Sequence, residues 1–131
     1  MNVGILIVTH GKLGRNLLDT MTEMMGGSLP LATDALEVRL VQTPEAMIMQ
    51  GSKMMERLDT GKGVLVLTDA FGSTPSNVAN KLSGSDNFVV IAGVNLPMLV
   101  RIFNYPKLAL TEMAKNAVEG GQRGIVQCPR E

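Results

Sequence analysis

The sequence predicts an α/β protein whose sheet is open, doubly wound and mainly parallel, with helices on both faces. Two observations support this fold class. Residues 3–9, 63–69 and 88–94 are nearly continuous aliphatic and β-branched runs, which are typical of strands buried on both faces. Segments with helical apolar spacing separate these runs, which implies right-handed crossovers between parallel strands. At 131 residues, the chain is expected to form one domain over residues 1–131.

The first predicted strand, residues 3–9, ends before His10 and Gly11. Apolar residues then recur at helical spacing over 13–25, and two glycines follow. A loop is expected over 28–34. Apolar and charged residues alternate over 36–40, which predicts a strand with one wetter face at an edge of the sheet.

Two proline signals mark the starts of the next helices. Thr43 is the expected N-cap of a helix that begins at Pro44 and buries a methionine-rich face up to residue 58. After the strand over 63–69, Thr74 and Pro75 repeat the signal, so Thr74 is the expected N-cap of the following helix.

The rest of the chain predicts a strand, two helices and a final strand. Following the strand over 88–94, a helix is expected from Asn95 to about Phe103. A second helix covers 108–118 and is expected to end at Gly120 and Gly121. Residues 124–128 predict a short last strand.

Composition excludes several function classes. The 12 basic and 12 acidic residues balance, whereas a nucleic-acid binder needs a basic face. No apolar stretch is long enough to cross a membrane, and the first residues lack the positive region of a signal peptide. The single cysteine, Cys128, excludes an internal disulfide and a multi-cysteine metal site. We therefore expect a cytoplasmic protein with no metal and no cofactor.

Polar residues leave the carboxyl ends of three predicted strands, where open α/β sheets bind ligands. Thr9 and His10 leave the first strand, Asp69 leaves the third and Asn95 leaves the fourth. A carboxylate bonded to one ring nitrogen of His10 would leave the other nitrogen as a nucleophile. On sequence alone, a packing role for His10 and a turn or capping role for Asp69 remain alternatives.

The turn Gly72-Ser73-Thr74 precedes a predicted helix, whose first N–H groups could bind a phosphoryl group together with the two hydroxyls. The alternative is an ordinary N-cap. The nucleophile elbow of hydrolases and the glycine fingerprint of dinucleotide sites are both absent from the sequence. Phosphoryl transfer to histidine needs only a nucleophilic nitrogen, in-line access and donors for the phosphoryl oxygens.

Three blocks, residues 8–11, 63–77 and 91–98, resemble the enzyme IIA domain of the mannose family of the phosphoenolpyruvate-dependent sugar phosphotransferase system. The resemblance covers essentially the whole chain. It implies that His10 accepts a phosphoryl group from the histidine-containing phosphocarrier protein and passes it to a IIB partner. It further implies that Asp69 orients the His10 ring and that the turn over 72–74 lies against the phosphoryl oxygens.

The resemblance also implies supporting roles and an assembly. Thr9, Gly11, Phe71 and Asn95 are expected to support the site. A homodimer is expected, in which the antiparallel strand over 124–128 is exchanged between subunits. Contact with the membrane would be indirect, through a IIC/IID permease.

Family members often carry Trp-Gly-Gly-Ser where this chain has Phe71-Gly72-Ser73-Thr74, and both forms keep a hydroxyl before the proline. Because the sequence stops at Glu131 without a IIB domain, the IIB partner is expected to be a separate protein or to be missing. Three alternatives remain open: a subunit that feeds a dihydroxyacetone kinase, a purely regulatory phosphoacceptor, and an anion-binding domain without a covalent step. The expected docking surface includes Leu13, Phe71 and Met98.

Overall fold

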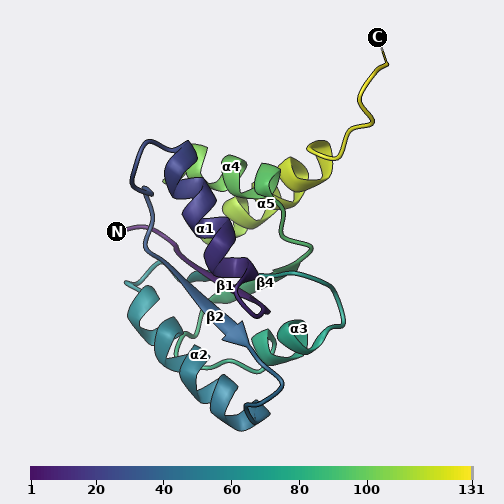
Figure 1. Cartoon of the computed structure of the whole chain (residues 1–131). Helices are drawn as coiled ribbons and strands as arrows, with labels where there is room; N and C mark the ends of the chain where they lie inside the picture. Colours follow the sequence, from purple (N-terminus) through teal and green to yellow (C-terminus); the bar gives the residue numbers. More distant parts are fainter. Residues whose placement is uncertain (131) are drawn as a thin grey trace.

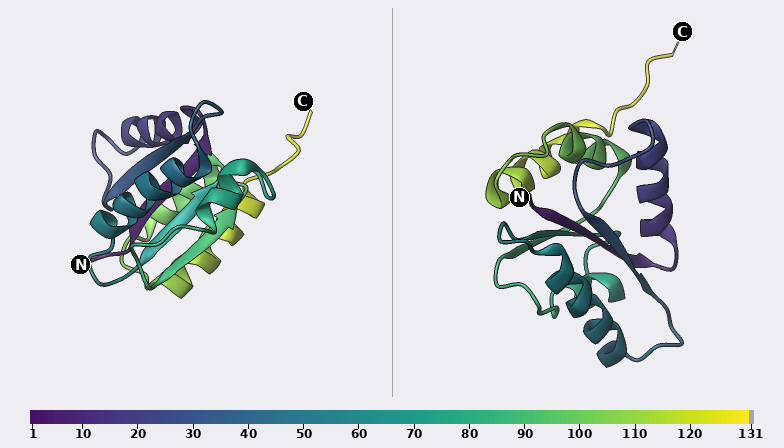
Figure 2. Two further views of the ribbon diagram at one scale, coloured as in Figure 1. Left: turned by 90° about the horizontal axis from the view of Figure 1, so that it is seen from below. Right: turned by 90° about the vertical axis from the view of Figure 1, so that its left-hand side faces the viewer.

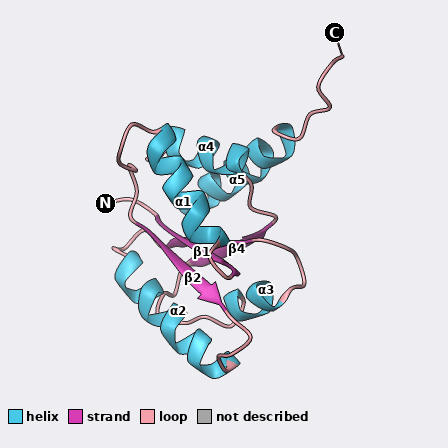
Figure 3. Cartoon of the chain, viewed as in Figure 1, coloured by secondary structure: helices cyan, strands magenta, loops and turns pink. Residues whose placement is uncertain are grey.

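The computed structural model describes residues 1–130 and contains four strands and five helices within them. The strands are β1 (Gly4–His10), β2 (Thr33–Val38), β3 (Val64–Thr68) and β4 (Phe88–Ala92). The helices are α1 (Leu13–Met24), α2 (Pro44–Leu58), α3 (Thr74–Ala79), α4 (Leu96–Asn104) and α5 (Leu110–Arg123). All strand pairs are parallel, in the order β2-β1-β3-β4, so the predicted parallel α/β sheet is confirmed (Figure 3).

Helices cover both faces of the sheet, as the doubly wound fold requires (Figures 1 and 2). Side chains alternate across a strand, so Ile5 and Ile7 of β1 pack in a core with α1, α4 and α5. Leu6 and Val8 pack in a second core with α2 and α3. β1 and β3 are buried on both faces up to Thr9 and Thr68, and their sequences are apolar up to these polar ends.

The register of the sheet brings three loops together around the end of β1. β1 lies between β2 and β3, with His10 opposite Val38 and Val8 opposite Thr68. The segments that follow Val38 and Thr68 therefore emerge on either side of His10, at the carboxyl edge of the sheet.

Several predicted boundaries are confirmed. The Thr43 hydroxyl accepts a hydrogen bond from Ala46 N at 3.1 Å and caps α2, and Asn95 caps α4 in the same way. The expected edge position of the second strand is also confirmed. Thr74, in contrast, is the first residue of α3, and Ser73 is the N-cap, so the prediction for Thr74 was one residue late.

Two other predictions were wrong. β2 begins at Thr33, within the expected loop, because residues 33–38 pair with residues 5–10 of β1, and Asp34 is accommodated by an ion pair with Arg15 at 3.0 Å. Gly120 and Gly121 do not end α5. They lie inside it, where a Cβ at Gly120 would be 2.6 Å from Arg101 Cβ, so they permit close packing on α4.

The predicted strand over 124–128 is not formed within the single chain. Gly124 is the C-cap of α5, and residues 125–130 have no regular secondary structure. They extend away from the sheet (Figure 1). A strand needs a neighbour to pair with, and this segment has none among the described residues.

Candidate functional site

His10, the last residue of β1, is held by Asp69, the first residue after β3. One carboxylate oxygen, Asp69 Oδ2, lies 2.6 Å from His10 Nδ1 and also accepts a hydrogen bond from His10 N at 2.9 Å. The His10 side chain is 62% exposed, whereas that of Asp69 is 11% exposed. The ring is therefore fixed at Nδ1, while most of its surface is open to solvent.

The environment of Asp69 favours the carboxylate. Burial alone would raise the pKa of Asp69, but hydrogen bonds from the His10 backbone, the His10 ring and Ala70 N outweigh it, and the pKa lies below its usual value. A charged Asp69 accepts the Nδ1–H of the ring and thereby selects the tautomer with an unprotonated Nε2.

Thr9 and Gly11 fix the backbone on either side of His10. The buried Thr9 hydroxyl accepts a hydrogen bond from Gly14 N at 2.8 Å and donates to His10 O at 3.3 Å, which ties β1 to the first turn of α1. Gly11 has a φ of +48° and donates from its N–H to Val38 O at 3.0 Å. A positive φ at this position favours glycine.

The turn after Asp69 lies beside His10, and its two hydroxyl side chains, Ser73 and Thr74, differ in their hydrogen bonding. The Ser73 hydroxyl donates to Ala70 O at 2.6 Å, and Ser73 N donates to the same oxygen at 3.2 Å. Within the described residues, the exposed Thr74 hydroxyl makes no hydrogen bond. Gly72 has a φ of +79° and open space around its Cα. Thr74 is thus the hydroxyl that is free to meet a ligand.

The other residues expected near the site differ in their placement. Asn95 accepts from Met98 N at 2.9 Å and donates from Nδ2 to Gly121 O at 3.1 Å, so its amide braces α4 against α5. Phe71 is 92% exposed. Met98 is buried, so the expectation that it belongs to a docking surface was wrong.

Sequence reasoning missed two exposed side chains beside the site and one feature of β3. Leu40 and Val41, which follow β2, are almost fully exposed, although the alternating pattern placed Leu40 in a strand. No signal in the sequence separates an exposed aliphatic residue of a loop from a half-buried one of a strand. The Thr68 hydroxyl is buried without a hydrogen-bond partner among the described residues.

Residues 1–130 contain no group of three or more His, Cys, Asp or Glu side chains placed to hold a metal ion. They also include no helix that is long and apolar enough to cross a membrane.

The fold and the site together define a class: a parallel α/β protein that presents one exposed histidine, oriented by an aspartate, at the carboxyl edge of its sheet. Comparison with known proteins makes the class specific. The sequence profile of the EIIA-man family, described as "PTS system fructose IIA component", matches residues 4–118. The chain belongs to this family of IIA components of the phosphotransferase system, and the resemblance to the mannose family is confirmed.

Individual relatives agree with the family assignment. The mannose-specific EIIAB component of Escherichia coli K12 is 32% identical over 128 residues, which are 95% of this chain and 39% of that protein. The chain thus spans about two fifths of that relative's length. A fucose-operon IIA protein from Streptococcus pneumoniae is 25% identical, with a TM-score of 0.79 and coverage of 97% and 93%.

A mannose/sorbose-specific IIA subunit from Enterococcus faecalis shares the fold. Its TM-score is 0.81 at 23% identity, over 100% of this chain and 98% of that one.

Proposed function

We propose that this chain is a cytoplasmic phosphocarrier subunit in which His10 accepts a phosphoryl group from the histidine-containing phosphocarrier protein and passes it to a IIB partner during sugar uptake. The observation that carries the proposal is the pair of hydrogen bonds from His10 to one oxygen of Asp69. A phosphoryl carrier needs a nucleophile that is both oriented and accessible, and His10 meets both requirements.

In the proposed transfer, the lone pair of His10 Nε2 attacks the phosphorus of the donor's phosphohistidine. The new P–N bond forms as the donor's P–N bond breaks, and the electron pair of the broken bond returns to the donor ring. The proton on His10 Nδ1 stays in its hydrogen bond to Asp69 Oδ2. As the His10 ring gains positive charge, the adjacent carboxylate of Asp69 stabilises it.

The turn formed by Gly72, Ser73 and Thr74 is proposed to receive the phosphoryl oxygens. Gly72 leaves room for close approach, and Thr74 offers a hydroxyl without another partner in residues 1–130. Ser73 supports the turn through its two hydrogen bonds to Ala70 O. Donors that are already aligned stabilise the charge that spreads over the transferring group.

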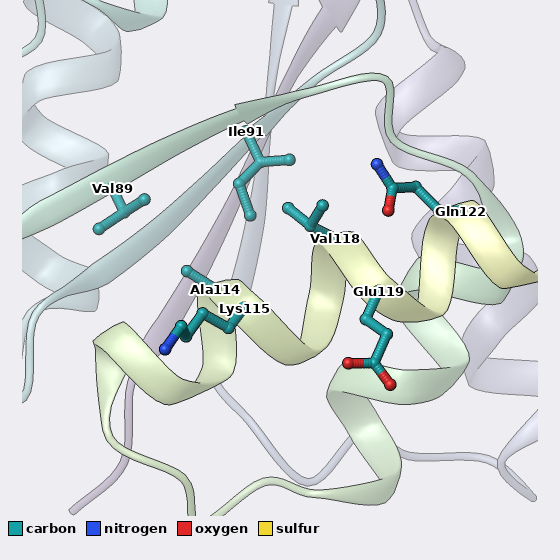
Figure 4. A pocket seen from close by; sticks show the side chains of 7 residues that line it. All are labelled: Val89, Ile91, Ala114, Lys115, Val118, Glu119 and Gln122. Atoms are coloured by element: carbon teal, nitrogen blue, oxygen red, sulfur yellow. The ribbon is translucent and has the colours of Figure 1, made fainter.

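A homodimer with exchanged C-terminal segments is part of the proposal. β4 is an edge strand, and Val89 and Ile91 of β4 border an open apolar groove with Ala114 and Val118 of α5 (Figure 4). Ile125 and Val126 of the extended segment are exposed in the single chain. These apolar side chains would fill such a groove in a second copy and cover its edge. Loss of the dimer on removing residues 124–131, measured by light scattering, would support this.

Phosphorylation of His10 tests the proposal directly. The chain is incubated with phosphoenolpyruvate, enzyme I and the phosphocarrier protein, and acid-labile phosphate is measured on wild type and on His10→Ala. We expect one phosphoryl group per wild-type chain and none on the variant. An unlabelled wild type, or equal labelling of His10→Ala, would show that the proposed function is wrong.

A further inference from the structure

The exposed apolar side chains of this protein are not evenly spread. Of the eleven large hydrophobic residues that are exposed among residues 1–130, four follow the carboxyl ends of β1, β2 and β3: Leu13 at the start of α1, and Leu40, Val41 and Phe71 on loops. Leu40 is 100% exposed and Val41 is 91% exposed. Consecutive, fully exposed aliphatic residues are costly in water and mark interaction sites when they gather beside a functional group.

The loop that carries Leu40 and Val41 is held next to His10. Val38 lies opposite His10 in the sheet, and its carbonyl accepts a hydrogen bond from Gly11 N at 3.0 Å. Leu40 is two residues further along the chain, a span of at most about 7 Å. A turn, closed by Gln42 N and Arg39 O at 3.2 Å, shapes the loop before α2 begins.

Phe71 occupies the matching position on the other side of His10. It comes two residues after Asp69, which bonds the His10 ring, and its side chain is 92% exposed. The histidine thus stands between two exposed apolar groups that leave the neighbouring strands β2 and β3. Lys12 adds an exposed cation beside this surface, and Asp69, the carboxylate closest to the ring, is mostly covered.

We infer that Leu40 and Val41, together with Phe71, form the docking surface for the protein that delivers the phosphoryl group to His10. The inference rests on the proposed function. A donor that brings a phosphohistidine to within bonding distance of Nε2 must cover the side chains around His10. Its matching face is therefore apolar around an anionic phosphohistidine, in keeping with the apolar surface and the Lys12 cation.

The test compares the double variant Leu40→Ser/Val41→Ser with Met24→Ser and with Leu40→Ile/Val41→Ile. Met24 is 58% exposed at the far end of α1, so Met24→Ser removes a similar side chain away from His10. Initial rates of labelling are measured against the concentration of phosphorylated phosphocarrier protein. A second series uses phosphoramidate, a small phosphoryl donor that needs no docking surface.

We expect the serine double variant to raise KM for the phosphocarrier protein about tenfold, with kcat and the phosphoramidate rate close to wild type, because it loses apolar contact area. Met24→Ser and the isoleucine variant should keep the wild-type KM. An unchanged KM in the serine variant would overturn the inference, and so would an equal fall in its phosphoramidate rate. A changed oligomeric mass of the serine variant would also overturn it, because the surface would then bind a second copy of the chain. A wild type that phosphoramidate labels but the phosphocarrier protein does not would instead refute the proposed function.

Discussion

Two aspartates at opposite edges of the sheet accept several hydrogen bonds each, yet only one belongs to the candidate site. At the carboxyl edge, Asp69 accepts from His10 and Ala70. At the amino edge, Asp59 accepts from Ser85 Oγ at 2.6 Å and from Gly61 N and Gly63 N at 2.9 and 3.0 Å. The hydrogen bond from Ser85, followed by those from the two glycines, holds the pKa of Asp59 below its usual value, so both carboxyls favour the charged form.

What differs is the group that each carboxylate holds. Asp59 ends α2 and ties the turn before β3 to the turn before β4, and all its donors are backbone N–H groups or a hydroxyl. Asp69 holds an imidazole that is largely exposed, and exposed apolar side chains lie on the segments that follow β2 and β3. A lowered carboxyl pKa therefore does not identify a site; the accessible imidazole beside Asp69 is what sets the candidate site apart.

Replacing each carboxylate by its amide should separate the two roles most strongly. Asp69→Asn should slow phosphorylation of His10 about a hundredfold, because the amide neither selects the Nδ1–H tautomer nor balances charge on the ring. Asp59→Asn should leave the rate unchanged. Labelling time courses with phosphorylated phosphocarrier protein would measure both. Similar rates for the two variants would remove the distinction.

The two hydroxyls of the turn provide a finer comparison within the carboxyl edge. Thr74→Ala should slow labelling about tenfold, the effect of one lost hydrogen bond in the transition state, and should leave stability unchanged. Ser73→Ala should lower the free energy of unfolding by about 1 kcal/mol, because its hydroxyl bonds Ala70 O in the folded protein. Rates and denaturant unfolding of both variants should be measured together; a stability loss in Thr74→Ala alone would reverse these assignments.

The hydrogen bonds of Asp59 at the amino edge of the sheet should contribute to the free energy of unfolding. Asp59→Asn should lower the free energy of unfolding by about 1 kcal/mol, a modest figure since the carboxylate is partly exposed to solvent. Urea unfolding followed by circular dichroism would measure it, with Asp86→Asn, an exposed residue of the same loop region, as the control. Equal stability of wild type and Asp59→Asn would mean that water replaces these hydrogen bonds at no cost.

Acid should reduce the stabilising effect of Asp59 gradually. Its pKa is lower in the folded chain than in the unfolded one, so its contribution is fully present above the ordinary aspartate pKa of about 3.9 and is lost as the pH falls through the folded value. The difference in unfolding free energy between wild type and Asp59→Asn should therefore be constant near neutral pH and shrink below about pH 4. A difference that persists in acid would exclude the charge as its origin.

The parallel sheet could be anticipated because it follows from local patterns, and the pairing of His10 with Asp69 because the family resemblance implies it. Apolar runs predict β1 and β3, and parallel crossovers place their carboxyl ends at the same edge of the sheet. That β1 and β3 are direct neighbours is known only from the structure. The start of β2 could not be anticipated, because the partners of the Asp34 carboxylate, Arg15 and Arg57, come from distant parts of the sequence. The hydrogen bond from the Ser73 hydroxyl to Ala70 O could not be anticipated either, because it depends on where Ala70 O lies in the folded turn.

The segment after α5 shows a different limit. The sequence predicts a strand over residues 124–128, but a strand must pair with a neighbouring strand, and residues 1–130 of the single chain provide none for it. The low helix propensity of glycine predicts that α5 ends at Gly120 and Gly121. In the structure the helix continues through both residues, because their close packing against Arg101 and Met98 outweighs the low propensity.

The double hydrogen bond from His10 to one oxygen of Asp69 also has a consequence for conformational entropy. An exposed side chain normally samples several rotamers, and ordering it during an encounter with a partner costs free energy. In His10 the backbone N–H and the ring Nδ1 meet the same atom, so folding has already restricted both side-chain torsions. In the proposed transfer, the phosphoryl donor therefore meets a nucleophile that needs no rotational search, which suits a short-lived encounter better than a tight complex.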